Sequence, residues 1–183
     1  MVAILLGNGF EEMEALCPCD CLRRVGVEVR LVSVDGGKVV MGAHGIDVVA
    51  DCSLREIDAD EIDLIMLPGG LGGVNAISAS RSAMQLIRDV YEMEGYVAAI
   101  CAAPTVLAAL GITDGKRATC YPGMEDRMGT AQMCMAQPVV QDGRVITSTA
   151  AGTAMEFALY LVQLLRGEQA AEELKEGLVY HCR

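Results

Sequence analysis

The sequence predicts a doubly wound α/β fold, in which a mostly parallel sheet carries helices on both faces. Three observations favour this class. Short apolar runs typical of buried strands alternate with longer segments typical of helices. Glycine and proline close several of the apolar runs. No internal repeat, low-complexity tract or linker interrupts the alternation, so we expect one domain over residues 1–183.

The individual elements follow from these apolar runs and from the turn signals between them. Strands are expected over 2–7, 27–34, 63–68, 96–100 and 117–120, with one hairpin turning at residues 43–45 and another at residues 142–143. Helices are expected over 11–25, 80–94, 104–111, 152–166 and 168–178. Pro18 removes an amide donor from the first helix, so this helix is either disturbed there or begins near residue 18.

Composition argues against several classes of partner. The net charge is −11 with no basic run to offset it, which disfavours nucleic acid and anionic membranes as partners. The chain has no Trp, and no apolar stretch reaches the roughly 18 residues of a membrane span. The first apolar run lacks a basic leader and does not resemble a signal peptide. We therefore expect a cytoplasmic protein.

Eight cysteines stand out for such a chain, and they do not form the paired C-x-x-C units of a zinc ribbon. Cys17 and Cys21 are four residues apart and share a helix face, whereas Cys19 lies off it. A soft-metal site for Cu(I) is one interpretation of this pair, and small core residues is the simpler one. Cys120 is interpreted either as a resolving thiol for Cys101 or as a buried strand residue.

Three loops follow predicted strands, at the sheet edge where doubly wound folds hold their sites. They are residues 7–12, residues 68–71 and residues 101–103. Cys101 stands where a buried strand turns into a helix, the arrangement of a nucleophile elbow. The dipole of the following helix would favour its thiolate. The alternative is an inert cysteine buried at a strand end.

Four stretches in this order resemble the DJ-1/ThiJ/PfpI superfamily, and specifically its DJ-1-like branch. They are GFEEMEA (9–15), LPGG (67–70), AAICAAPTVL (98–107) and TSTAAGTAMEFAL (147–159). The resemblance extends over nearly the whole chain. It implies the flavodoxin-like sandwich of that family, usually assembled as a homodimer.

The resemblance also implies a site. It places the reactive cysteine at Cys101, its carboxyl partner at Glu14, and an oxyanion-type pocket at the amides of Gly69 or Gly70 and Ala102. Further candidates for the pocket are Glu11, Tyr121, His44 and Thr149, and such dimers can bring a basic residue like His44 toward the partner's pocket.

The activity implied is a cofactor-independent glyoxalase that converts methylglyoxal to lactate, or a deglycase, with small 2-oxoaldehydes as substrates. No metal or organic cofactor is expected at this site. The alternative implied by the family is a redox-sensing or chaperone-like stress protein whose reactive cysteine is oxidised. Amidase or peptidase activity, as in the PfpI branch, is the least favoured.

The chain departs from the family pattern at three positions. Ala102 stands where the PfpI branch has a histidine, and Tyr121 stands where DJ-1-like relatives have a histidine before a proline. Thr149 stands where many relatives have an arginine. A Cys–His dyad is therefore not expected, which argues against proteolysis. Instead, we expect a protonated Glu14 to donate a hydrogen bond to the thiolate and to lower the pKa of Cys101.

Overall fold

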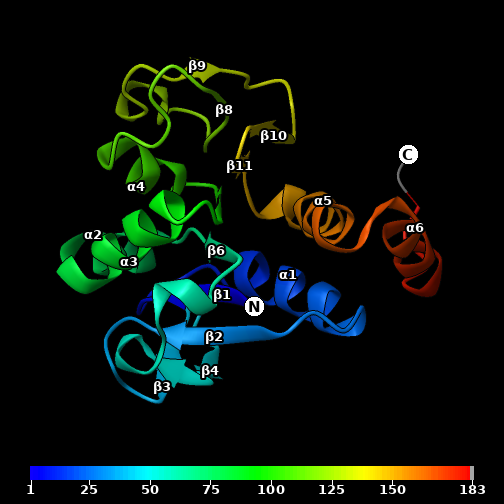
Figure 1. Ribbon diagram of the computed structural model, residues 1–183, viewed down its shortest axis with the longest axis horizontal. Helices are drawn as coiled ribbons and strands as arrows, with labels where there is room; N and C mark the ends of the chain where they lie inside the picture. Colours follow the sequence, from blue (N-terminus) through cyan, green and yellow to red (C-terminus); the bar gives the residue numbers. More distant parts are fainter. Residues whose placement is uncertain (182–183) are drawn as a thin grey trace.

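The apolar runs form the strands of one seven-stranded sheet in a computed structural model, which describes residues 1–181 (Figure 1). The strand order is β10-β11-β7-β6-β1-β2-β5, and all neighbours are parallel except β10 and β11. The strands are β1 (Val2–Leu6), β2 (Val29–Ser33), β5 (Cys52–Ser53), β6 (Leu64–Leu67), β7 (Tyr96–Ile100), β10 (Val139–Asp142) and β11 (Val145–Ser148). The predicted doubly wound architecture is confirmed.

Six α-helices are described, and they cover the sheet on both faces. They are α1 (Glu12–Arg24), α2 (Leu71–Ala79), α3 (Arg81–Glu92), α4 (Pro104–Ala109), α5 (Ala154–Arg166) and α6 (Glu168–Gly177). Figure 1 shows α1, α5 and α6 on one side of the sheet and α2, α3 and α4 on the other. Within residues 1–181, no helix combines the length and apolar character that crossing a bilayer requires.

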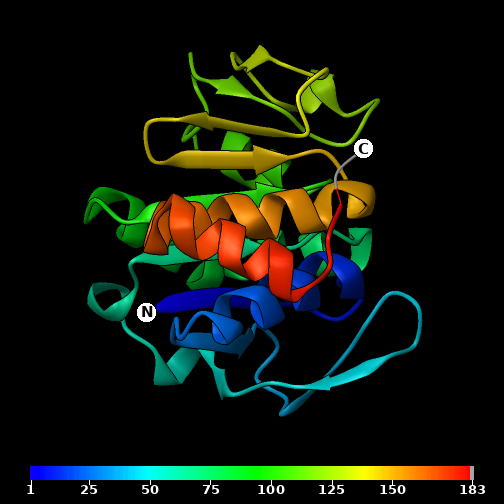
Figure 2. The same cartoon turned by 90° about the vertical axis from the view of Figure 1, so that its right-hand side faces the viewer.

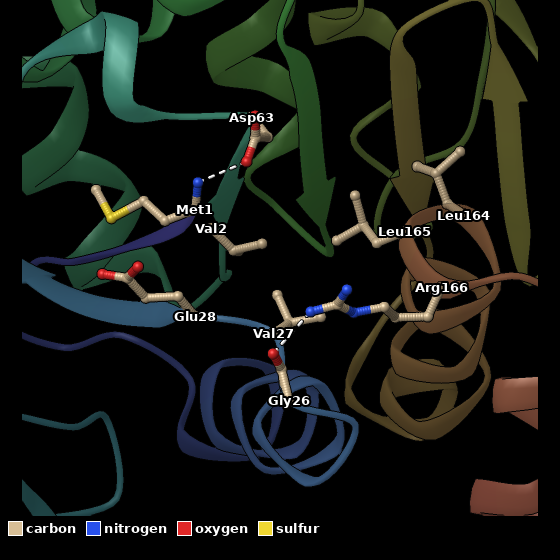
Figure 3. A pocket seen from close by; sticks show the side chains of 9 residues that line it. All are labelled: Met1, Val2, Gly26, Val27, Glu28, Asp63, Leu164, Leu165 and Arg166. Atoms are coloured by element: carbon tan, nitrogen blue, oxygen red, sulfur yellow. Dashed lines mark hydrogen bonds and ion pairs between the residues drawn. The ribbon is translucent and has the colours of Figure 1, made fainter.

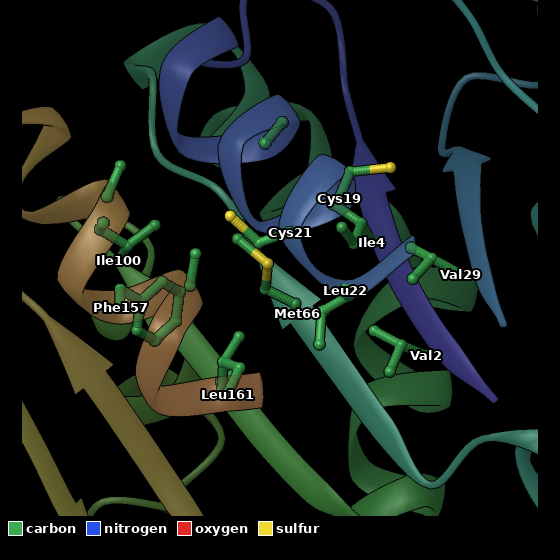
Figure 4. Packing of buried hydrophobic residues seen from close by; sticks show 14 of the residues in the cluster. Val2, Ile4, Cys19, Cys21, Leu22, Val29, Met66, Ile100, Phe157 and Leu161 are labelled. Carbon is green, nitrogen blue, oxygen red and sulfur yellow. The ribbon is translucent and has the colours of Figure 1, made fainter. Parts of the chain in front are cut away.

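The central strands are buried on both sides, which is why they appear in the sequence as uninterrupted apolar runs. Alternate residues of β1 point to opposite faces: Ile4 packs toward α1 and α5, whereas Leu5 packs toward α2, α3 and α4. Figure 4 shows the first of these layers, in which Met66 of β6 and Phe157 of α5 meet the buried side of α1.

Within the described residues, two small sheets and four short 3-10 helices lie outside the main sheet. The hairpin of β3 (Val39–Met41) and β4 (Asp47–Val49) is antiparallel and turns at residues 43–45 as predicted. It projects from the body of the molecule and is cyan in Figure 2. The remaining elements are β8 (Arg117–Ala118), β9 (Gln132–Met133), η1 (Leu54–Glu56), η2 (Ala59–Glu61), η3 (Glu125–Arg127) and η4 (Ala151–Thr153).

Two expectations about helices need correction. Helix α1 begins at Glu12 and continues through Pro18, so the alternative start near residue 18 is wrong. Helix α2 was not expected, because Gly72 and Gly73 are poor helix formers. Their lack of side chains is needed here: a Cβ on Gly73 would lie 2.8 Å from the Cα of Phe10. Close packing of α2 on the loop after β1 therefore outweighs the local propensity.

Candidate active site

Cys101 is held in a tight turn at the carboxyl end of β7. Its φ is +66°, in the left-handed region that non-glycine residues rarely adopt. Its amide donates to the carbonyl of Ser148 at 3.0 Å, and its carbonyl accepts from the amide of Tyr121 at 2.7 Å. These two bonds fix the backbone on both sides of the cysteine. A strained residue held in this way between a strand and a helix has the geometry predicted for a nucleophile elbow.

Glu14 reaches the same point from the first turns of α1. Its side chain is 1% exposed, and one carboxyl oxygen, Oε2, accepts the Gly69 amide at 2.7 Å. The same carboxyl shares a hydrogen bond with the Cys101 thiol. The structure thus brings together two residues that are 87 positions apart in the chain, and we call them the Cys101–Glu14 pair.

Glycine is required where the loop after β6 crosses this pair. A Cβ on Gly69 would lie 2.5 Å from Oε2 of Glu14 and 2.7 Å from the Cβ of Cys101. Gly70 has a φ of +80°, and a Cβ there would collide with the backbone of Gly9 and Glu11. Because neither position tolerates a side chain, the loop lies directly against the carboxyl and the thiol.

The pKa values of both members of the Cys101–Glu14 pair are strongly shifted. Burial raises the pKa of Glu14 to about 7, although the Gly69 amide and the Cys101 thiol oppose the shift. Burial, the negative charge of Glu14 and the hydrogen bond to its carboxylate raise the pKa of Cys101 to about 12. At neutral pH the sulfur therefore carries its proton as long as Glu14 is ionised.

The raised pKa of Glu14 agrees with the expected protonation of this carboxyl by burial. The expected lowering of the Cys101 pKa is wrong, because burial and Glu14 raise it. Helix α4 has only six residues, so little helix dipole acts on the sulfur. The two groups that do stabilise negative charge there are the backbone amides of Ala102 and Gly70, which both lower the pKa of Cys101. The predicted contribution of the Gly69 amide is different, because that amide is donated to Glu14.

Tyr121 and Thr149 lie in the two segments that hold Cys101. Tyr121 contributes its backbone amide to the Cys101 carbonyl, while nearly half of the residue's surface is exposed. Thr149 follows Ser148, which binds the Cys101 amide, and its hydroxyl donates to Oγ1 of Thr153 at 3.3 Å. Both therefore belong to the rim of the site.

Glu11 and His44 take part in a separate cluster with Glu12. The His44 ring nitrogen Nδ1 lies 2.8 Å from Oε2 of Glu12 and 3.4 Å from Oε2 of Glu11, and the His44 amide donates to Oε1 of Glu12. Burial alone would raise the pKa of Glu12, but the two bonds from His44 outweigh it and lower this pKa. The hydrogen bond that His44 donates to Glu12 and the charge of Glu11 raise the pKa of His44. These three residues bring metal-ligating atoms within 4.8 Å of one another.

Sequence reasoning missed the buried role of Glu12. This residue is 4% exposed, and its carboxylate ties the turn of the β3–β4 hairpin to the first turn of α1, two residues before Glu14. The sequence around Glu12 did not indicate that it is buried, because acidic residues at a helix start are commonly exposed and stabilise the helix dipole.

Cys120 is fully buried in a small apolar cluster with Ala118 and Met128, and burial raises its pKa to about 11. This favours the interpretation as a buried residue over that of a resolving thiol. Cys182, the last of the eight cysteines, lies outside the described residues.

A hollow at the opposite edge of the sheet is distinct from the candidate site. Figure 3 shows it between Met1, Asp63 and Arg166, at the amino ends of β1 and β6. Its ion pair joins the N-terminal ammonium to Asp63, and Arg166 donates to the Gly26 carbonyl. The ammonium and Asp63 bind each other and Arg166 binds a backbone carbonyl, so these three charged groups already have partners.

Comparison with known proteins places this geometry in a family. Residues 1–164 match the sequence model of the DJ-1/PfpI family. The chain is 40% identical to the dj-1beta protein of Drosophila melanogaster over 177 residues, covering 96% of this chain and 95% of that protein. It is 32% identical to a protein named as a deglycase from Pyrococcus abyssi, covering 90% of this chain and 99% of that one. The crystal structure of Drosophila DJ-1beta superposes with a TM-score of 0.92 at 38% identity, covering 99% of this chain and 98% of the other. The chain therefore belongs to the DJ-1/PfpI family and has its flavodoxin-like fold.

Proposed function

We propose that the protein is a cofactor-independent enzyme of glyoxalase or deglycase type, acting on small 2-oxoaldehydes through Cys101 and Glu14. The observation that carries this proposal is a buried carboxyl with a pKa of about 7, hydrogen-bonded to a thiol at a strained elbow. A pKa near the working pH is what a group that alternates between base and acid requires. The name of the Pyrococcus relative supports the same class of chemistry.

The first step is attack of the Cys101 sulfur on the aldehyde carbon of methylglyoxal. The thiol proton passes to the Glu14 carboxylate as the carbon–sulfur bond forms, so no free thiolate needs to accumulate. The amides of Gly70 and Ala102 are directed at the sulfur, and we propose that they also stabilise the oxygen that becomes negative. Glu14 then returns its proton to that oxygen, which completes the hemithioacetal.

The second step moves a hydrogen between neighbouring carbons. Glu14 removes the proton from the former aldehyde carbon and delivers it to the former ketone carbon by way of an enediol. In the same isomerisation the hydroxyl proton on the carbon that bears sulfur passes to the former ketone oxygen. The product is a thioester of lactate on Cys101. Water hydrolyses this thioester, releasing lactate and restoring the thiol. The sequence of steps consumes one water and needs no oxidant or reductant.

The test is lactate formation from methylglyoxal by the purified protein. We expect wild type to produce lactate, Cys101→Ala to fall to the uncatalysed rate, and Glu14→Gln to lose most of the rate. Cys134→Ala is the matched control, because Cys134 is another half-buried thiol. It hydrogen-bonds the Gln132 carbonyl, away from the Cys101–Glu14 pair. Equal rates for wild type and Cys101→Ala would exclude the mechanism.

A redox-sensing role is the second candidate, and the position of Glu14 against the sulfur supports it. A protonated carboxyl there can hydrogen-bond the sulfinate that oxidation of Cys101 produces. The raised pKa of Cys101 argues in the other direction, because thiolates are oxidised fastest. Intact mass after graded additions of peroxide decides between them: a sensor gains oxygen at Cys101 before the other thiols react.

We also propose that the protein forms a homodimer through the β3–β4 hairpin. Val39 and Val49 are paired across the hairpin, and together with Met41 they form an apolar face that is more than half exposed. Monomeric soluble proteins seldom leave such faces uncovered. We expect light scattering to give twice the chain mass for wild type and the chain mass for Val49→Glu. A monomeric wild type would contradict the proposal.

A further inference from the structure

Helix α1 carries sulfur on two different sides, and the proposed reaction uses none of it. Cys17 and Cys21 are four residues apart and so lie on one face. Figure 4 shows the sulfurs of Cys19 and Cys21 pointing to opposite sides of α1, with Cys21 on the side of α5. This separation matches the sequence-based expectation and identifies Cys19 as an internal control.

The structure adds a third sulfur from another helix. The Cys17 and Cys21 side chains share a hydrogen bond, and Sγ of Cys21 lies 3.9 Å from Sδ of Met155 in α5. We call these three residues the α1–α5 sulfur cluster. Cys21 is 1% exposed, whereas Cys17 and Met155 are half-buried, so the cluster is reachable from its two ends.

The ligand types in this cluster determine which metal ions it would bind. Two thiolates and a thioether are soft ligands, which favour Cu(I) over hard cations. Zinc instead takes four ligands in tetrahedral geometry. Metal–sulfur bonds of about 2.3 Å, the length of a zinc–thiolate bond, place the sulfurs of a trigonal site about 4 Å apart. The spacing between Cys21 and Met155 fits this value without rearrangement of the helices.

We propose that the α1–α5 sulfur cluster binds one Cu(I) ion through Sγ of Cys17, Sγ of Cys21 and Sδ of Met155. Binding exchanges the two thiol protons for the metal and involves no change of oxidation state. The site is independent of the reaction proposed at Cys101.

The test is an anaerobic competition for Cu(I) between the full-length protein and a chromophoric chelator such as bicinchoninate. All variants carry Cys101→Ala, which removes the other candidate thiol. We expect one tightly bound Cu(I) in this background. Cys17→Ser should weaken binding about 100-fold or more, because even groups outside a ligand set change metal affinity about 10–100-fold. Cys19→Ser should bind as the background does.

Met155→Leu is the second variant, since Cys21 is buried and its replacement affects packing. We expect X-ray absorption to show three sulfur ligands in the background protein and two in Met155→Leu. Circular dichroism and thermal melts establish that each variant is folded. Unchanged Cu(I) affinity in Cys17→Ser, or an equal loss in Cys19→Ser, would overturn the proposal. Lactate formation by the single variant Cys17→Ser should remain at the wild-type rate, so failure here is distinguishable from failure of the proposed enzyme function.

Discussion

The Cys101–Glu14 pair and the α1–α5 sulfur cluster draw on the same helix, yet their surroundings give sulfur different properties. Glu14, Cys17 and Cys21 are spaced by three and four residues and follow one stripe of α1. At one end of the stripe, a buried carboxyl and two backbone amides surround the thiol of Cys101. At the other end, each thiol has another sulfur as its neighbour. The elements that pack against α1, rather than the helix itself, decide what each position can do.

The largest expected difference between the two regions follows from Gly69→Ala. The new methyl group would lie 2.5 Å from Glu14 Oε2 and 2.7 Å from the Cβ of Cys101, so the pair must separate. Since a displacement of about 1 Å costs roughly 100-fold in rate, we expect lactate formation to fall by about that factor. Cu(I) binding should be unchanged, because the sulfur cluster is formed without this loop. Gly177→Ala is the control, at a position where a Cβ meets nothing within 4 Å. A Gly69→Ala variant with wild-type kinetics would mean that the pair is not the reacting centre.

Next in size is the effect of pH on the stability of Glu14→Gln. The folded pKa of about 7 lies above the ordinary value of 4.5, so the folded state holds this proton more tightly than the unfolded state. Stability is therefore lost as pH rises from 4.5 through 7. Gln cannot ionise, so relative to wild type the variant should gain roughly 2.5 kcal/mol in the free energy of unfolding between pH 5 and pH 8.

Urea unfolding at pH 5 and pH 8 measures this change. Glu92→Gln, which removes an exposed carboxyl from α3, controls for the change in net charge. If the difference between Glu14→Gln and wild type were the same at both pH values, burial would not control the proton of Glu14.

A smaller effect is expected on thiol reactivity. Glu14→Gln removes the negative charge beside Cys101, which contributes to the raised pKa of that thiol. Each unit of pKa changes the thiolate fraction about tenfold, so we expect alkylation of Cys101 at pH 8 to accelerate by about that factor. Cys17 should react at its wild-type rate, since its pKa depends chiefly on Cys21. Peptide mass spectrometry after iodoacetamide treatment reports both rates. Slower alkylation of Cys101 would show that Glu14 assists the thiol mainly as a base.

The smallest effect concerns His44, which ties the β3–β4 hairpin to the first turn of α1. Its raised pKa means that its contribution to stability is present at low pH and is lost as pH rises through the folded value. The lowered pKa of Glu12 means that its contribution fails only in acid. We therefore expect His44→Gln to lower the melting temperature at pH 6 more than at pH 9. His181→Gln, at another exposed histidine, should leave the melting temperature unchanged at both pH values. If His44→Gln lowered the melting temperature equally at both pH values, His44 would stabilise the fold through packing and not through its charge.

Most of the fold could be predicted because its elements are locally encoded. The buried strands appear as apolar runs, and the hairpin turns carry glycine where the backbone needs a positive φ, as at Gly143 with a φ of +59°. Helix α2 could not be predicted, since Gly72 and Gly73 are explained only by the backbone of the loop after β1, against which they pack.

The candidate site was likewise predicted only in part. The position of Cys101 at a strand-to-helix junction is visible in the sequence, and resemblance to the family indicated Glu14. The raised pKa of Glu14 agrees with the expected protonated carboxyl. The direction of the Cys101 shift was missed, because it depends on how deeply segments far away in the chain bury the thiol beside Glu14.

By itself the sequence determined the alternation of strands and helices, the elbow at Cys101 and the shared face of Cys17 and Cys21, because each depends on residues a few positions apart. The tertiary structure decided that Glu14 meets Cys101, that the Gly69 amide holds the carboxyl, and that Met155 reaches Cys21. The physical reason is that burial and hydrogen bonding between distant segments set pKa values and ligand geometry. Those segments come together only when the sheet and its two helical layers close around them.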